Sequence, residues 1–249
     1  MNRPTFYCAG SSAALTYASE FLHALGWTNT PVPSPAATHL LLPVPSFDAN
    51  GQIKGGLLLE EILAQLPHDV TVIGGNLNHT ALKSYHTIDL LQDTRYLAEN
   101  ALITAYCAVR VAMEKLPVTL RDCPVLVIGW GRIGKCLTKL LRSMGARVTV
   151  AARKDSDKAM LTALGYDVQD SLSLVPAAYR LIYNTAPNLI VPADFCGNAL
   201  KIELASQLGI QGSDVIWAKG LPGLLAPESS GKLIAETVYR ILSGKEVRA

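Results

Sequence analysis

Several features are scarce in this 249-residue chain, and each absence excludes a class of protein. The five cysteines lack paired spacing, which argues against a disulfide framework or a zinc site and is typical of a reducing cytoplasm: Cys8, Cys107, Cys123, Cys136 and Cys196. No run of Lys or Arg occurs and the net charge is only +2, so we expect no nucleic-acid partner. No apolar run approaches the roughly 20 residues that span a bilayer, so we expect no membrane association.

Glycines, by contrast, are grouped in a spacing found at dinucleotide sites. Residues 125–128 form an apolar run that predicts a buried parallel strand, and Gly129, Gly131 and Gly134 follow it as G-x-G-x-x-G. In this motif one glycine permits the bend, one the close approach of a pyrophosphate, and one the packing of helix against strand. A helical pattern and a second apolar strand, at 147–152, come next. This context favours a dinucleotide site over an empty βαβ unit.

An acidic residue is missing where an NAD site needs one. Such sites place Asp or Glu about 20 residues past the glycines, where the carboxylate binds the ribose 2′-hydroxyl. Here the second strand ends at Ala152, and Arg153 and Lys154 follow. A guanidinium can hold a 2′-phosphate through two parallel hydrogen bonds, whereas a carboxylate would repel it. We therefore expect NADP rather than NAD, the alternative being two solvated loop cations.

Apolar runs and helical patterns alternate along the chain, which predicts parallel sheets with right-handed crossovers. In the first part we expect strands at 5–8, 39–42, 70–73 and 87–90, with helices at 13–25, 57–65 and 80–84. A long helical pattern runs from 94 to 116. After the glycine motif we expect strands at 147–152, 181–184, 199–204 and 214–218 and a last helix at 226–242.

The expected fold class is α/β, with two domains joined by a long helix. We expect a smaller flavodoxin-like domain at 1–95, a connecting helix at 96–117, a Rossmann NADP-binding domain at 118–225, and a C-terminal helix at 226–249 that packs back toward the cleft. Ligands of such sheets bind at the carboxyl ends of the strands, so the cleft between the domains is the expected site.

Three segments that follow strands could reach a bound ligand. Asn184 and Thr185, before Pro187, could touch the nicotinamide ribose or form an ordinary turn. Glu203 ends an apolar run and needs a partner or a task, because an unpaired buried carboxylate is costly. The glycine-rich segment 220–223 could present backbone N–H groups to a carboxylate, or only lead into the last helix.

No histidine lies beyond residue 86; the five are His23, His39, His68, His79 and His86. Dehydrogenases of small 2-hydroxy acids need a base near neutrality beside the nicotinamide, usually a histidine from the later half. A histidine base from the second domain is therefore excluded, whereas His79 and His86 could reach a cleft from the first domain or be surface or core histidines. No Ser–His–Asp arrangement or metal-ligand cluster has suitable spacing, so the catalytic residue stays unassigned and no metal is expected.

Together these segments resemble the family formed by the A subunits of dipicolinate synthase over nearly the whole chain. The resemblance rests on Leu41-Leu-Pro-Val-Pro45, residues 100–108, the glycine turn, residues 148–153, Asn184-Thr185 with Pro187, Ala205-Ser206, and the block from Gly220-Leu-Pro-Gly223 through Ala226-Pro227 to Gly231. The chain departs from the family at Tyr106-Cys107, where the family reads Glu-Gly, at Glu203, where it has Asp, and in a loop shortened to 207–214.

The resemblance implies an architecture like that of formate and glycerate dehydrogenases. It also implies an NADP-linked oxidation of a dihydrodipicolinate-type ring to pyridine-2,6-dicarboxylate during sporulation, alongside a flavoprotein-like B subunit. The substrate carboxylates would be held by Asn100, Thr104, Gly220, Leu221, Pro222 and Gly223. The dinucleotide would be held by Gly129, Gly131, Arg132, Ile133, Gly134, Arg153, Lys154, Asn184, Thr185, Pro187, Ala205 and Ser206.

We also expect a homo-oligomer. The alternative function, from another class, is a catalytically decayed protein that binds NADP as a structural or sensing ligand. Tyr106 and the shortened loop favour that alternative, and the retained block at 220–231 opposes it.

Overall fold

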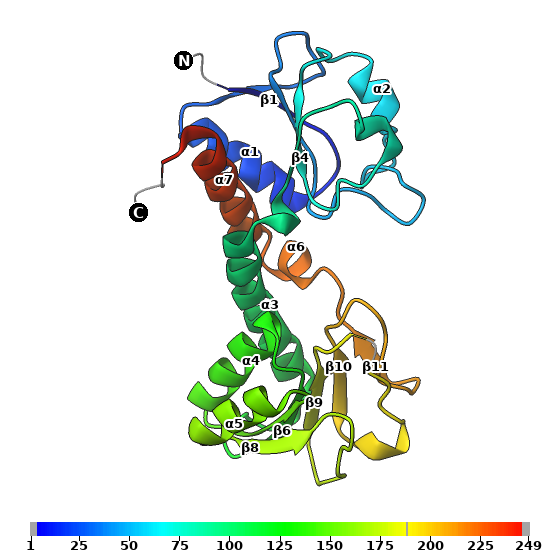
Figure 1. The fold of residues 1–249 in the computed structure, drawn as a ribbon, viewed down its shortest axis with the longest axis vertical. Coiled ribbons are helices and arrows are strands. Elements are labelled where there is room, and N and C mark those ends of the chain that lie inside the picture. The colour runs from blue at the N-terminus through cyan, green and yellow to red at the C-terminus, as the bar shows by residue number, and fades with distance from the viewer. Residues whose placement is uncertain (1–3, 188, 246–249) are drawn as a thin grey trace. The chain divides into compact units, whose positions relative to one another are not determined.

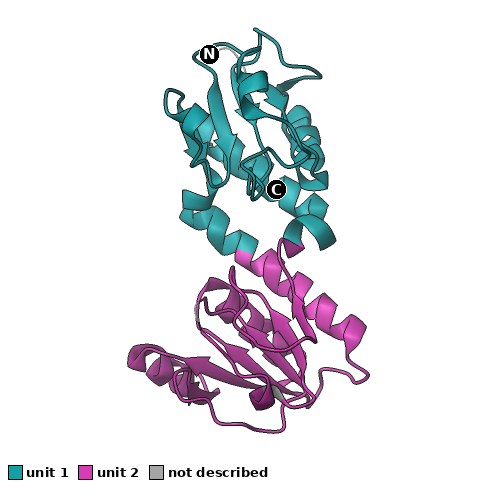
Figure 2. Ribbon diagram, turned by 90° about the vertical axis from the view of Figure 1, so that its right-hand side faces the viewer, with its two compact units in different colours: residues 1–100, 222–249 teal, residues 101–221 magenta. Residues whose placement is uncertain are grey.

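The structure is a computed structural model that describes residues 4–187 and 189–245. The chain divides into two compact units, one of residues 1–100 with 222–249 and one of residues 101–221 (Figure 2). The expected domain limits at 95, 117 and 225 stay predictions, and their outermost parts, 1–3 and 246–249, lie outside the described residues. None of the described helices is both long and apolar enough to cross a membrane.

The first unit contains a five-stranded, wholly parallel sheet in the order β2-β1-β3-β4-β5. Its strands are β1 (Thr5–Cys8), β2 (Thr28–Thr30), β3 (His39–Leu41), β4 (Thr71–Gly74) and β5 (Thr87–Asp89) (Figure 1). The order 2-1-3-4-5 is that of flavodoxin-like sheets. Short 3-10 helices, η1 (Thr80–Leu82) and η2 (Leu90–Gln92), flank β5.

Two helices of the first unit, α1 (Ala13–Ala24) and α7 (Pro227–Ser243), pack closely against each other although they lie far apart in sequence. Gly231 of α7 lies at the contact, where a Cβ would be 2.5 Å from the Ala14 carbonyl oxygen and 2.8 Å from the Ala18 nitrogen. The missing side chain therefore lets the two helix backbones approach. A separate core cluster joins the strands to the buried side of α2 (Leu59–Leu63).

The second unit contains a six-stranded parallel sheet in the order β11-β10-β9-β6-β7-β8. Its strands are β6 (Pro124–Ile128), β7 (Arg147–Ala152), β8 (Asp167–Asp170), β9 (Leu181–Asn184), β10 (Leu200–Glu203) and β11 (Val215–Trp217). Numbered from β6, this is the 3-2-1-4-5-6 order of the Rossmann fold. The prediction of an α/β protein with parallel sheets is therefore confirmed.

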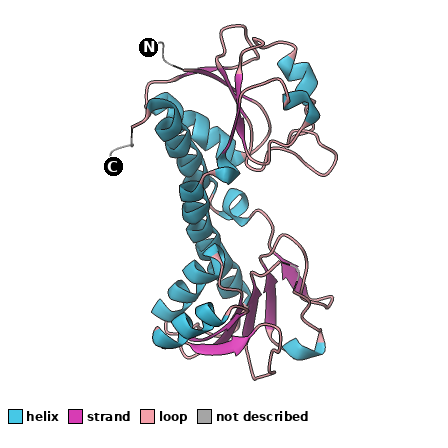
Figure 3. Ribbon diagram, in the orientation of Figure 1, coloured by secondary structure: helices cyan, strands magenta, loops and turns pink. Residues whose placement is uncertain are grey.

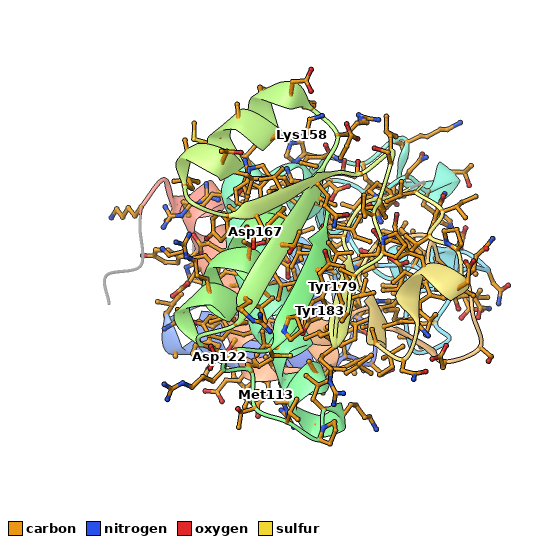
Figure 4. All side chains as sticks on the ribbon, turned by 90° about the horizontal axis from the view of Figure 1, so that it is seen from below. Met113, Asp122, Lys158, Asp167, Tyr179 and Tyr183 are labelled. Atoms are coloured by element: carbon orange, nitrogen blue, oxygen red, sulfur yellow. The ribbon has the colours of Figure 1, made fainter. Side chains whose placement is uncertain are left out.

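Some strands of this second sheet are connected by helices and others by loops (Figure 3). α4 (Arg132–Ser143) and α5 (Asp155–Ala163) connect β6, β7 and β8. α3 (Thr94–Lys115) is tied to the sheet by Tyr183 of β9, whose hydroxyl donates a 3.0 Å hydrogen bond to the Ala108 carbonyl (Figure 4). After β9 the crossovers are loops with one 3-10 turn, η3 (Asp194–Cys196), and their buried Val191 and Ile210 join the core of that sheet.

Most expected elements occur within two residues of the ranges derived from the sequence, and β1, β7 and β9 coincide with them. Three expectations differ. The helix expected at 80–84 is the 3-10 turn η1. The sequence patterns do not predict β2, α5 and β8, because these segments are mostly polar; β2 and α5 are largely exposed, and β8 is mostly half-buried. The glycine-rich turn expected at 220–223 is mostly the short helix α6 (Leu221–Leu225).

Because of the helix contact at Gly231, we expect Gly231→Ala to destabilise the protein, although helix propensity alone would predict that it stabilises α7. An alanine normally stabilises a helix by up to about 1 kcal/mol relative to glycine. In Gly231→Ala the added Cβ meets backbone atoms of α1, so we expect a loss of about 1–3 kcal/mol in the free energy of unfolding, measured by urea denaturation. The matched control is Gly223→Ala in α6, where a Cβ meets nothing and stability should not fall. Equal stabilities for Gly231→Ala and the parent would contradict this packing.

Candidate dinucleotide site at the carboxyl edge of the second sheet

The loop after β6 contains the glycine motif, and the structure gives each glycine a distinct role. Gly129 has a φ of +103°, which disfavours any side chain, and a Cβ there would lie 2.5 Å from Thr185 Oγ1. Gly134 packs against the carbonyl oxygen of Gly129 and has no room for a Cβ. Gly131 faces open space, with no atom within 4 Å of the position a Cβ would take. The turn thus leaves one backbone position open to an approaching group.

α4 begins directly after Gly131, and among the described residues no side-chain cap of its first N–H groups is present. Its first turn contains no Asp or Glu, and Arg132 is exposed while Ile133 is half-buried. Uncapped N–H groups and the positive end of the helix dipole favour an anion at this position. The first N–H groups of α4 can therefore donate hydrogen bonds to a pyrophosphate, and no carboxylate in this turn would repel its negative charge.

Thr185 ties the glycine turn to the neighbouring strand. Its hydroxyl donates to the Ile128 carbonyl oxygen at 2.9 Å, and its backbone N–H donates to the same oxygen at 2.8 Å. β6 and β9 are the two strands between which the strand order reverses. Doubly wound sheets bind their ligands at this switch point. The Thr185 side chain therefore helps to shape the turn, while Pro187, two residues on, is exposed.

Glu203, at the end of β10, is fully buried, yet among the described residues no cation lies within ion-pair distance of it. Instead its carboxylate accepts four hydrogen bonds: Oε1 from the Ala205 N–H at 3.0 Å, and Oε2 from Asn184 Nδ2 at 3.0 Å and the N–H groups of Gly209 and Ile210 at 2.9 and 3.1 Å. Such bonds offset the cost of removing the charge from water. The task expected for Glu203 is thus to organise the loop after β10.

This network also includes the Asn184 side chain, whose expected contact with a ligand stays a prediction. Its side chain is fully buried: Nδ2 donates to Glu203, and Oδ1 accepts the Ala186 N–H at 3.0 Å. The amide therefore holds the loop after β9 in place. Ala205 is also buried, whereas the next residue, Ser206, is exposed.

Arg153 and Lys154 follow β7, and both side chains are exposed. Within the described part of the chain neither forms an ion pair. Two of the acids nearby pair with another cation: Lys158 Nζ lies 2.8 Å from Asp155 and 2.6 Å from Asp170, while Asp157 also lies in the first turn of α5. The Lys158 hydrogen bond holds the pKa of Asp170 below its ordinary value. Figure 4 shows Lys158 on α5. The arrangement leaves Arg153 and Lys154 available to a phosphate.

The residues expected to hold substrate carboxylates fall in both compact units. Asn100, Pro222 and Gly223 belong to the first unit, and Thr104, Gly220 and Leu221 to the second. Thr104 and Leu221 are buried, Asn100 and Pro222 half-buried, and Gly220 and Gly223 exposed. Because the six residues are divided between the two units, their shared role stays a prediction.

Tyr106, two residues after Thr104 on α3, points in another direction. Thr104 is buried, whereas Tyr106 is 58% exposed. Tyr106 lines a hollow of about 410 Å³ with Met113 of α3 and with Leu140 and Met144 at the end of α4. This placement agrees with the helical spacing, which puts positions 104 and 106 on different faces.

Two residues that the sequence patterns did not single out also lie at this edge of the sheet. Trp217 ends β11, and the ammonium of Lys219 lies 3.4 Å from the centre of its indole ring. The only signal in the sequence was their position directly before Gly220, at the start of a block already assigned to substrate.

The strand order, the glycine turn at the switch point and the uncapped start of α4 define a Rossmann-type α/β protein of the dinucleotide-binding class. The A subunit of dipicolinate synthase from Bacillus subtilis (strain 168) is 24% identical over 237 residues, covering 85% of this chain and 80% of the relative. The expected resemblance to the dipicolinate synthase A subunits is therefore confirmed. No protein-family profile matches the chain.

Solved structures agree on the fold. The A subunit of dipicolinate synthase from Bacillus halodurans superposes with a TM-score of 0.82 at 21% identity, covering 96% of this chain and 98% of that chain. The D-lactate dehydrogenase of Salmonella has a TM-score of 0.57 at 12% identity, covering 99% and 98%. The architecture is thus shared with a 2-hydroxyacid dehydrogenase, as the sequence resemblance implied.

Glu203→Gln tests the buried carboxylate. A glutamine offers one carbonyl oxygen and places an N–H₂ group against N–H donors, so at least one buried donor loses its acceptor. We expect the free energy of unfolding to fall by about 1–3 kcal/mol, measured by urea denaturation. The Gly209 and Ile210 amides should also exchange hydrogen faster. Glu114→Gln, at an exposed position on α3, is the control and should change stability by less than about 0.5 kcal/mol. Unaltered stability and exchange in Glu203→Gln would show that the charge is not needed.

Proposed function

We propose that this protein is an NADP-dependent oxidoreductase that oxidises a dihydrodipicolinate-type ring to pyridine-2,6-dicarboxylate. One observation carries the cofactor assignment: an open backbone position at Gly131 adjoins the uncapped start of α4, and unpaired cations follow the next strand. The similarity to the A subunit of dipicolinate synthase over 85% of the chain supports the substrate class.

In this proposal different residues bind the different parts of the dinucleotide. The first N–H groups of α4, with Gly129, Gly131 and Gly134 allowing close approach, hold the pyrophosphate, and Arg132 and Ile133 border it. Arg153 and Lys154 bind the 2′-phosphate. Thr185, Pro187, Ala205 and Ser206 form the floor beneath the nicotinamide ribose, and Asn184 acts indirectly by fixing their loops.

Bound NADP+ would supply a hydride acceptor, and the ring would lose a hydride to it and a proton to a base or to water as it becomes aromatic. The gain of aromaticity favours this oxidation, so the protein's main task is to position the ring and its carboxylates. We assign that task to Asn100, Thr104 and the segment from Gly220 through Leu221 and Pro222 to Gly223. The carboxylate of Glu203, at the carboxyl edge of the sheet, already accepts four hydrogen bonds from the protein. We therefore do not assign it as the proton acceptor, and we assign no other side chain to this role.

The wider setting follows from the same similarity. We propose that the protein acts in sporulation beside a flavoprotein-like B subunit, as a homo-oligomer in the cytoplasm. The free thiols of Cys8, Cys107, Cys123 and Cys136 are consistent with a reducing compartment.

A second candidate is an NADP-binding protein without catalysis, serving a structural or sensing role. Tyr106 favours it, because this phenol replaces the glutamate of the family and is exposed on a different face of α3 from Thr104. The two candidates share the cofactor site and differ only in turnover.

Turnover can be measured directly as formation of NADPH from NADP+ and dihydrodipicolinate, with and without a B subunit. We expect the parent protein to form dipicolinate and Gly131→Val to lose both turnover and NADPH binding, because the side chain occupies the space needed by the pyrophosphate. The melting temperature without ligand should change little in Gly131→Val, since a Cβ at this position has no described atom within 4 Å apart from its chain neighbours. Ala159→Val, on an exposed position of α5, is the control for a β-branched substitution. NADPH binding without turnover would favour the second candidate, and normal binding by Gly131→Val would refute the site.

Cofactor choice gives a separate prediction. Because Arg153 and Lys154 stand where NAD sites have an acid, NADPH should bind at least about tenfold more tightly than NADH, a difference of about 1.4 kcal/mol. Arg153→Asp should abolish or reverse this preference. Arg121→Asp, another exposed arginine of the same unit, should leave it unchanged. Equal affinities of the parent protein for the two cofactors, measured by calorimetry, would contradict the assignment.

A further inference from the structure

The indole of Trp217 is a large apolar group held in a fixed position at the carboxyl edge of the second sheet. Trp217 is the last residue of β11 and pairs in register with Glu203 of β10. Its Nε1–H donates a 3.2 Å hydrogen bond to the Ala205 carbonyl oxygen, which directs the ring over the loop after β10. The residue is nevertheless 42% exposed. A tethered ring with this exposure is a surface on which another group can lie.

One such group is the ammonium of Lys219, which lies 3.4 Å from the ring centre. A cation over the face of an indole is attracted by the negative charge of the π system. Among the described residues no carboxylate pairs with Lys219, whereas two other lysines of the same unit, Lys158 and Lys201, each have Asp partners within 3 Å. Lys219 is thus a positioned cation whose three N–H donors are not used by a carboxylate of the protein.

This cation lies at the edge of the sheet to which we assign the dinucleotide. β9, β10 and β11 are successive neighbours, and adjacent strands are about 4.8 Å apart. The carboxyl end of β11 is therefore about 10 Å from that of β9, within the width of a carboxylate-bearing ring placed beside the nicotinamide. Ala205, which accepts the Trp217 hydrogen bond, belongs to the floor proposed for the nicotinamide ribose.

We propose that Lys219, positioned over Trp217, binds a carboxylate of the substrate. The inference deepens the proposed function and rests on its placement of the dinucleotide. The indole covers one side of the ammonium and removes it partly from water, which strengthens its interaction with an anion. Trp217 acts through Lys219 as a positioning residue.

Calorimetry on the full chain saturated with NADPH tests this assignment. The probes are pyridine-2,6-dicarboxylate, pyridine-2-carboxylate and pyruvate. Lys219→Met keeps an unbranched apolar chain against Trp217 and removes the charge, so we expect at least a tenfold loss of affinity for the carboxylate that binds the parent. Lys219→Arg should retain most of the affinity. Lys115→Met, at the exposed end of α3, is the control. NADPH affinity should be the same in all four proteins.

The outcomes separate this proposal from the proposed function. Unaltered carboxylate affinity in Lys219→Met, or the absence of carboxylate binding by the parent, would overturn the role of Lys219. Lys219-dependent binding of pyruvate, without binding of either pyridine compound, would support the carboxylate role and refute the ring as substrate. Loss of NADPH binding in Lys219→Met would assign the lysine to the cofactor instead and so overturn the proposal.

Discussion

Four N–H groups that converge on the buried carboxylate of Glu203 hold the carboxyl edge of the second sheet in place. The Glu203 carboxylate binds Asn184 at the end of β9 and the backbone of the loop after β10. Asn184 in turn fixes the Ala186 N–H, next to Thr185, which clamps the glycine turn after β6. A continuous set of hydrogen bonds therefore connects three strand ends. A buried charge without a counter-ion is stable only when its oxygens are satisfied, so the loops are held in the positions that supply those donors.

The charges around the turn after β7 are arranged to leave cations unpaired. Asp155 and Asp170 would weaken an anion site if they were free, but Lys158 binds both of them. Arg153 and Lys154 are exposed and form no ion pair within the described residues. At the end of β11, Lys219 lies over an indole and is not paired with a carboxylate of the described residues. The turn after β7 and the end of β11 thus present positive charge where the phosphate and carboxylate groups of the proposed ligands would lie.

Much of this unit could be predicted because local sequence specifies it. The apolar run of β6 has all but its first residue buried, and such runs indicate central parallel strands. The roles of Gly129 and Gly134 also follow from the motif, since neighbouring atoms leave no room for a Cβ at either position once the turn forms. β8 and α5 could not be predicted in the same way. Their residues are mostly polar, and their pairing with β7 depends on a sheet that already exists.

The role of Asn184 shows the limit of the sequence most clearly. An Asn after a buried strand is compatible with a ligand contact or with a turn, and its hydrogen bond to Glu203, 19 residues later, could not be predicted from the sequence. The contact of Lys219 with Trp217 and the helix crossing at Gly231 are likewise properties of packed side chains and backbones. The sequence by itself determined the α/β class, the glycine turn and the absence of an acid after β7, because each depends on neighbours along the chain. Only the tertiary structure decided which polar groups are satisfied internally and which remain for a ligand, because that depends on contacts between residues far apart in sequence.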